Sequence, residues 1–265
     1  MRVITTDAYH QIVEFAEDEA LPTQFDQASG VYHKPCNHAQ GAPGRTYIRT
    51  QLAQDTQIKI WRGLIDASFV GNLLATDQVA ADKDLYGSSV DGAMVLTLAS
   101  GLVGVFKPAR SDDPTTGTHW SEITAYEVDR AIGLNCVPIT VHRDQPESGS
   151  IQLWVDGLTV MDSGALPANL RFFDKLIANS DRGGNLYPNF KAHAQAPNGC
   201  VAFDNGCSFL GKVTGLAAAK AIITPAVPIL GALVGLQASQ FQRLPKPQQT
   251  SLQERITELR QLFAA

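Results

Sequence analysis

Alternating apolar and polar positions in the centre of the chain predict β-strands. Ala93–Ala99 and Leu102–Lys107 are rich in β-formers and are separated by Ser100-Gly101, a pair typical of a tight turn. This spacing predicts a β-hairpin. Val137–Val141 and Ile151–Val155 predict two further strands.

Helical periodicity dominates the second half of the chain. Thr118–Ile132 predicts a helix with Thr118 as its N-cap and Gly133 as its C-terminal stop. A later helix is predicted by apolar residues that recur at helical spacing and form one buried stripe: Leu166, Leu170, Phe173, Leu176 and Ile177. Short strands are expected at Leu186–Phe190 and Cys200–Phe203.

The two ends of the chain have weaker patterns. Ala8–Ala20 has a weak helical pattern, and Gln54–Ala81 predicts one or two helices. The tail is predicted to be helical, with a break at Pro245–Gln249 before a last helix over Ser251–Phe263, because proline removes backbone donors. A strand-rich first half followed by a helix-rich second half predicts an α+β fold of two lobes with a cleft between them. The expected division is an N-terminal helical or irregular extension over residues 1–82, a β-rich N-lobe over 83–158 and a helical C-lobe over 159–265.

Composition narrows the class of protein. A chain of 265 residues with 44% hydrophobic and 18% charged residues can bury a full core. A net charge of −5 argues against nucleic acid as the main partner. The only long apolar run, Gly215–Leu236, is interrupted by a lysine and two prolines, so buried helices are expected there and not a membrane span. The start of the sequence lacks the apolar core of a signal peptide, and the four cysteines form no CxxC pair, which favours reduced thiols in a cytoplasmic protein.

Acidic and amide side chains gather around two loops in the second half. The stretch that ends in Asp181-Arg182-Gly183-Gly184-Asn185 delivers an acid and an amide into a turn that glycines allow to bend sharply. Asp204 follows a predicted strand and precedes Asn205-Gly206. Phosphoryl transfer needs one carboxylate to orient a hydroxyl, here Asp181, and hard oxygen ligands for Mg²⁺, here Asn185 and Asp204. Asn179 or Asn189 can take the place of Asn185.

A lysine and a phosphate-binding turn are expected to complete this site. Lys107 ends the second hairpin strand on the same face as two valines, where a lysine is costly unless it meets an anion. Glu122, near the start of the next helix, is the expected partner, and Glu127 is its rival. Gly87, Ser88 and Ser89 precede the first strand, and such small residues let backbone N–H groups approach phosphates.

Several of these segments together resemble the atypical kinases: the phosphatidylinositol 3-/4-kinases, the bacterial HipA-like kinases, and the four-jointed and Golgi casein kinase group. Glu122–Leu134 followed by Val137-Pro138 is similar to their kinase helix, and Gly149–Val155 to the strand that leads to their hinge. The Asn-x-Asp-Arg and Asp-Asn-Gly segments match their catalytic and metal-binding motifs, although the loop between Asp181 and Asn185 is one residue shorter and lacks a histidine.

The resemblance covers roughly Gly87–Leu210 and implies a two-lobed kinase-like fold with ATP between the lobes. It implies that Lys107 and Glu122 form the ion pair, that Asp181 is the catalytic acid or base, that Asn185 and Asp204 bind Mg²⁺ or Mn²⁺, and that Gln152 lies at the nucleotide. The expected function is ATP-dependent phosphorylation of a protein hydroxyl, in a bacterial regulator or an injected effector. The alternatives are a pseudokinase or binding module, a lipid kinase, and transfer of a group other than phosphate.

Overall fold

The structure is a computed structural model of the 265-residue chain. It describes residues 2–6, 11–15, 24–26, 31–33, 48–51, 56–62, 66–85, 92–109, 119–161, 164, 166–179, 181–182, 189–211 and 216–264. The chain divides into two compact units, one formed by Met1–Phe106 with Ile151–Asp156, the other by Lys107–Ser150 with Gly157–Ala265. The predicted division into an extension and two lobes, with boundaries at residues 82 and 158, stays a prediction.

The first unit begins with short strands. β1 (Arg2–Thr6), β2 (Gln11–Phe15) and β5 (Ile48–Gln51) form an antiparallel sheet in the order β1-β2-β5, and β3 (Gln24–Asp26) pairs with β4 (Val31–His33). The helix suggested by the pattern of Ala8–Ala20 is therefore wrong. Pairing with two neighbouring strands outweighs a weak helical periodicity, because strand preference depends strongly on context.

Two helices follow, in agreement with the prediction for Gln54–Ala81. They are α1 (Thr56–Trp61) and α2 (Ala67–Thr76). The carboxylate of Asp66 caps α2 by accepting hydrogen bonds from the backbone N–H groups of Ser68 and Phe69 at 2.8 and 3.1 Å.

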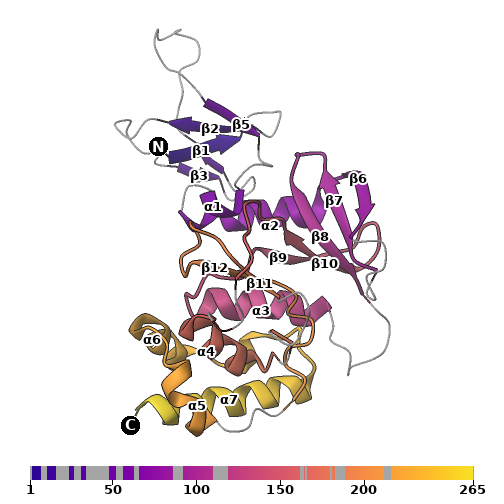
Figure 1. Ribbon diagram of the computed structural model, residues 1–265. Helices are drawn as coiled ribbons and strands as arrows, with labels where there is room; N and C mark the ends of the chain where they lie inside the picture. The colour runs from indigo at the N-terminus through magenta and orange to yellow at the C-terminus, as the bar shows by residue number, and fades with distance from the viewer. Residues whose placement is uncertain are drawn as a thin grey trace. The chain divides into compact units, whose positions relative to one another are not determined.

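The predicted hairpin is present in the larger sheet. β6 (Val79–Asp84), β7 (Met94–Leu98), β8 (Val103–Pro108) and β10 (Gly149–Leu153) lie in the order β6-β7-β8-β10 (Figure 1). Gly101, with a φ of 84°, makes the turn between β7 and β8. A Cβ at Gly104 would lie 2.7 Å from Ile151 Cγ1, so β8 approaches β10 closely only because position 104 is a glycine.

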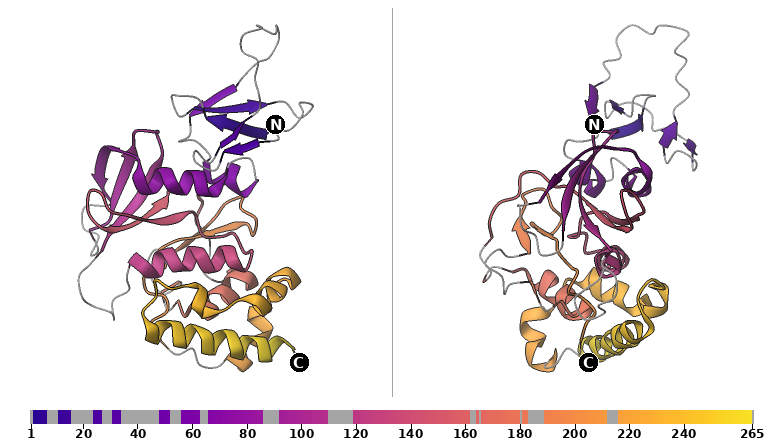
Figure 2. Two further views of the ribbon diagram at one scale, coloured as in Figure 1. Left: turned by 180° about the vertical axis from the view of Figure 1, so that it is seen from behind. Right: turned by 90° about the vertical axis from the view of Figure 1, so that its right-hand side faces the viewer.

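The second unit is mostly helical. α3 (His119–Ala131) ends where Gly133, with a φ of 71°, stops it as predicted. The unit also contains three short strands: β9 (Thr140–Arg143) and the antiparallel pair β11 (Phe190–Ala192) and β12 (Cys200–Ala202). The other helices, which lie together in both views of Figure 2, are α4 (Ala168–Ile177), α5 (Leu216–Ile223), α6 (Val227–Gly235), the 3₁₀ turn η3 (Ala238–Gln240) and α7 (Lys246–Ala264).

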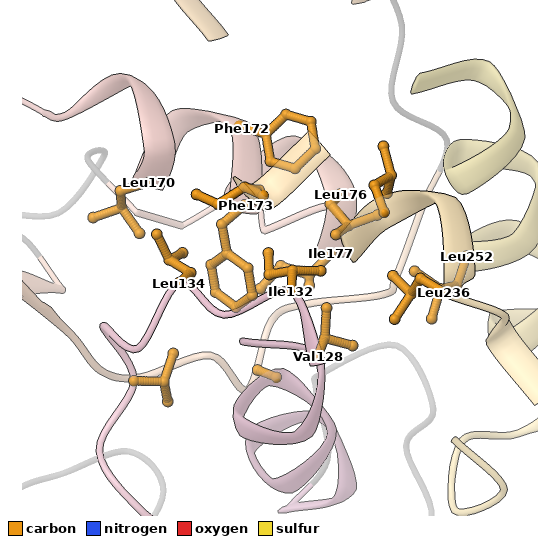
Figure 3. Close-up of a cluster of buried hydrophobic side chains, with 14 of the residues drawn as sticks. Val128, Ile132, Leu134, Leu170, Phe172, Phe173, Leu176, Ile177, Leu236 and Leu252 are labelled. Carbon is orange, nitrogen blue, oxygen red and sulfur yellow. The ribbon is translucent and has the colours of Figure 1, made fainter. Parts of the chain in front are cut away.

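A buried apolar cluster joins these helices (Figure 3). Four of the five residues in the predicted stripe of α4 are buried in it, and Leu166 packs against it half-buried. The cluster includes residues of α3, α4 and α7, among them Val128, Ile132, Leu170, Phe172, Phe173, Leu176, Ile177 and Leu252. The backbone of α4, and with it the start of the Asp181 loop, is therefore held by core packing.

The predicted break at Pro245–Gln249 is wrong. α7 begins at Lys246, so Pro247 lies in its first turn, where a helix needs no backbone N–H and tolerates proline. Among the helices of the described residues, none combines the length and the apolar character needed to cross a membrane.

Candidate functional site

Lys107, Glu122 and Asp204 form a cluster in the second unit. The ammonium group of Lys107 donates hydrogen bonds both to Glu122 Oε1 and to Asp204 Oδ1. The side chain of Glu122 is 4% exposed, that of Lys107 21% and that of Asp204 43%. The buried end of the cluster is thus the helix glutamate, and the end open to solvent is Asp204.

Glu122 is fixed by its place in the first turn of α3 and by a second interaction. Its Oε2 accepts a hydrogen bond from the backbone N–H of Asn205 at 2.8 Å. The expected ion pair with Lys107 is confirmed. The rival Glu127 instead contacts Arg243, with 2.6 Å between Oε1 and Nη1. The valines that share the face of Lys107 are only half-buried, while Gly104 and Phe106 form the buried face of β8.

Charge explains why this lysine remains protonated. Burial lowers the pKa of Lys107, but the negative charges of Glu122 and Asp204, with their hydrogen bonds, more than offset this and raise the pKa above its usual value. Two carboxylates around one ammonium group leave an excess negative charge, so a cation is favoured beside Asp204.

Asp181 lies in the loop after α4, where two asparagines hold it. Its backbone N–H donates to Asn179 Oδ1 at 2.9 Å. Asn189 donates from Nδ2 to the backbone carbonyl of Asp181 at 3.1 Å, and Nδ2 lies 3.4 Å from Asp181 Oδ2. Asn189 is buried. Of the two alternatives to Asn185, Asn189 therefore lies directly against the predicted catalytic acid.

The Asp204 loop has an unusual backbone conformation. Asp204 has a φ of 55°, in the left-handed region that residues other than glycine rarely adopt. At Gly206 a Cβ would lie 3.4 Å from Glu122 Oε1, so the loop passes close to the glutamate. Left-handed residues persist only where their surroundings fix them, and they often occur at functional sites.

Arg182 connects the two loops. It is 4% exposed, and its Nε donates to Asp174 Oδ1 at 3.0 Å. Its Nη1 donates to the carbonyls of Asn189 and Phe203 at 2.8 and 2.9 Å, and its Nη2 donates to Asn205 Oδ1 at 2.5 Å. The sequence motif contains Arg182, but no role was predicted for it, and nothing in the spacing of the chain indicates its four acceptors.

The remaining predicted site residues belong to the first unit or are not described. Gln152 lies half-buried in β10. Gly87, Ser88, Ser89 and Asn185 lie outside the described residues. Within the described part of the chain, no three His, Cys, Asp or Glu side chains form a cage for a metal ion. Mg²⁺ does not need one, since it is usually held by one or two carboxylates together with phosphates and water.

Comparison with known proteins supports a kinase-like fold. No protein-family model matches the sequence, and no curated protein matches it either. A crystal structure of the Golgi casein kinase matches with a TM-score of 0.56 and 13% identity over 79% of this chain and 80% of that chain. The Golgi casein kinase with Mn/ADP bound matches with a TM-score of 0.53 and 14% identity over 74% and 76%. Hydra Fam20 with sugar matches with a TM-score of 0.52 and 14% identity over 78% and 94%.

These likenesses show the class of fold. The chain has a mixed α/β fold of the atypical kinase kind, with an antiparallel sheet and a helical part. The specific resemblance to the HipA-like and phosphatidylinositol kinases stays a prediction.

Proposed function

We propose that this protein is an ATP- and divalent-metal-dependent phosphotransferase, an atypical kinase that phosphorylates serine or threonine hydroxyls of a protein. One observation carries the proposal: Lys107 lies between Glu122 and Asp204, and Asn205, the next residue, shares Arg182 with the Asp181 loop. A strand lysine held by a helix glutamate, with two further acids, is the set of groups that phosphoryl transfer requires. The fold is similar to that of the Golgi casein kinase, one structure of which is a Mn/ADP complex.

Each residue has a separate role in this proposal. Lys107, oriented by Glu122, contacts the α- and β-phosphates. Asp181 accepts or directs the proton of the acceptor hydroxyl. Asp204 holds Mg²⁺ or Mn²⁺ together with an asparagine. That asparagine is Asn185 or Asn189, and the Nδ2 of Asn189 donates to the backbone carbonyl of Asp181. The bound metal supplies neutralisation of the charge on the phosphates.

The proposal also includes contacts to the nucleotide. Gly87, Ser88 and Ser89 would present backbone N–H groups to phosphates, and Gln152 would contact the base. Both assignments come from the sequence pattern and the resemblance.

The test is ATP-dependent labelling. Wild type, Asp181→Asn and Asp204→Asn are incubated with γ-labelled ATP, Mg²⁺ or Mn²⁺ and a cell lysate. We expect wild type to label a protein and both variants to lose the label by about 100-fold or more, because each removes an interaction made during transfer. Asp144→Asn is a matched control, because its side chain is 79% exposed and bonds only to His142 among the described residues.

Mass analysis of the product distinguishes the alternatives. An added phosphate on a serine or threonine supports the proposal. An added nucleotide or another group would show a different transferase, and a labelled lipid would show a lipid kinase. Nucleotide binding without any labelled product would favour a pseudokinase.

A further inference from the structure

Arg182 donates hydrogen bonds to residues of both loops of the proposed site. It follows Asp181 directly in the chain. It binds the carbonyl of Phe203 and the side chain of Asn205, which flank Asp204, and the carbonyl of Asn189, which holds Asp181. The loops of the two acids are thus connected through one guanidinium group, and by a longer contact through Asn179, whose Oδ1 accepts from the Asp181 N–H and whose Nδ2 donates to Asn205 Oδ1 at 3.4 Å.

The core anchors this group from the other side. Asp174 lies on α4 directly after Phe173 of the apolar cluster, is buried, and pairs with Arg182 at 2.9 Å between Oδ1 and Nη2. Burial raises the pKa of Asp174, and the charge of Arg182 opposes that rise. Desolvation of both charges offsets most of the attraction in a buried ion pair, so the pair between Asp174 and Arg182 is better explained by the geometry that it fixes than by stability.

Arginine is required by the arrangement of acceptors. Four acceptors surround Arg182. One is on α4, one precedes β11, one follows β12 and one is the side chain that follows Asp204. The planar guanidinium presents five N–H donors in fixed directions, whereas a lysine presents three from a single nitrogen. A lysine at position 182 can retain the charge but not this set of bonds.

We propose that Arg182 is a positioning residue that sets the placement of Asp204 relative to Asp181 and thereby the affinity for the metal–nucleotide complex. This inference rests on the proposed function. It assigns Arg182 no contact with substrate or metal. Residues that orient metal ligands typically change metal affinity by about 10- to 100-fold when they are replaced.

The experiment compares two buried arginines. Arg182→Lys and Arg255→Lys are purified and their melting temperatures measured, and Mn²⁺ binding in the presence of ADP is followed by electron paramagnetic resonance. Arg255 is a matched control because it is 3% exposed and donates to the carbonyls of Leu176 and Gly211, neither of which lies within residues 179–189 or 203–206. We expect both variants to melt at lower temperature, but only Arg182→Lys to lose Mn²⁺ affinity, by about tenfold or more.

A second variant covers the case in which Arg182→Lys does not fold. Asn205→Ala removes one acceptor of Arg182, an oxygen that also accepts from Asn179 Nδ2 at 3.4 Å, while the backbone N–H of residue 205 and the Arg182–Asp174 pair remain. We expect a smaller loss of Mn²⁺ affinity, about threefold to tenfold. Equal Mn²⁺ affinity in wild type and in both site variants would overturn the role of Arg182 alone. If wild type itself binds no Mn²⁺ with ADP, the proposed function fails and the inference fails with it.

Discussion

Two buried carboxylates on helix α3 behave in opposite ways. Glu122 and Asp129 lie about two turns apart on the same helix, and each is at most 3% exposed. Glu122 has a lysine on one oxygen and a backbone N–H on the other. Asp129 accepts from the backbone N–H and the thiol of Cys136 on Oδ1, at 3.0 and 3.2 Å, while its Oδ2 is buried without a hydrogen-bond partner among the described residues.

The difference follows from what stabilises a buried carboxylate: a cation beside it and hydrogen bonds to both oxygens. Burial raises the pKa of Asp129 to about 7, although the hydrogen bonds from Cys136 oppose the rise. Glu122 shares the Lys107 ammonium group with Asp204, a half-exposed acid, so its charge has a cation beside it that Asp129 lacks. The proposed function uses the Glu122 end of α3, whereas the buried Asp129 at the other end lowers the stability once it is ionised.

Replacing Glu122 by glutamine should have the largest effect. Glu122→Gln keeps the shape and can still accept from the backbone of Asn205, but it leaves Lys107 with Asp204 as its only carboxylate in the cluster. We expect kcat/KM for ATP to fall about 100-fold, equivalent to about 2.7 kcal/mol. The measurement is the labelling rate at several ATP concentrations.

A readout independent of activity strengthens this test. Since Glu122 helps to raise the pKa of Lys107, its loss should lower that pKa and speed acylation of the amine at alkaline pH. Asp129→Asn is the control, being the same kind of change on the same helix, and should leave the labelling rate unchanged. A Glu122→Gln enzyme with full activity would remove the distinction between the two carboxylates.

Asp129→Asn should instead change the free energy of unfolding, and only above about pH 4. In the unfolded chain an aspartate titrates near pH 4, whereas in the folded protein Asp129 titrates at about 7. Between these values the folded state binds the extra proton, so Asp129 makes wild type progressively less stable as pH rises from 4 to 7. We expect the Asp129→Asn variant and wild type to be similar in stability at pH 4, and the variant to be more stable by roughly 4 kcal/mol at pH 8.

Urea denaturation of both proteins from pH 4 to 8 checks this difference. The variant must be compared with wild type at each pH, because His119 changes the stability in the opposite direction. Burial, with the nearby His142, lowers the pKa of His119 to about 4. The contribution of His119 to stability therefore rises between pH 4 and about 6.5. A gap between variant and wild type that does not depend on pH would show that Asp129 does not titrate in this range.

The helix and hairpin that carry this cluster follow from local patterns, whereas its connections do not. The end of α3 at Gly133, the turn at Gly101 and the pairing of Lys107 with Glu122 are predictable, because glycine stops, turn residues and strand alternation are local signals. The predicted N-cap Thr118 lies outside the described residues. The contacts of Arg182 join residues 7 to 23 positions away through polar groups that have no periodicity. At the N-terminus the strand β2 escaped prediction because neighbouring strands, and not local sequence, determine it.

The smallest effect is expected at Glu127, the residue that the sequence leaves as a rival to Glu122. Glu127 pairs with Arg243 at the surface, where the two side chains are 31% and 51% exposed. Exposed pairs of this kind contribute less than about 1 kcal/mol, and salt screens them. Glu127→Gln should therefore lower the stability by less than about 1 kcal/mol at low salt, and by less still in about 0.5 M NaCl, with no change in labelling.

Arg243→Met should have a larger effect than Glu127→Gln, because Arg243 also lies over the Trp120 ring, 5.9 Å from its centroid. A loss of labelling in Glu127→Gln as large as in Glu122→Gln would instead make Glu127 a functional carboxylate of this helix.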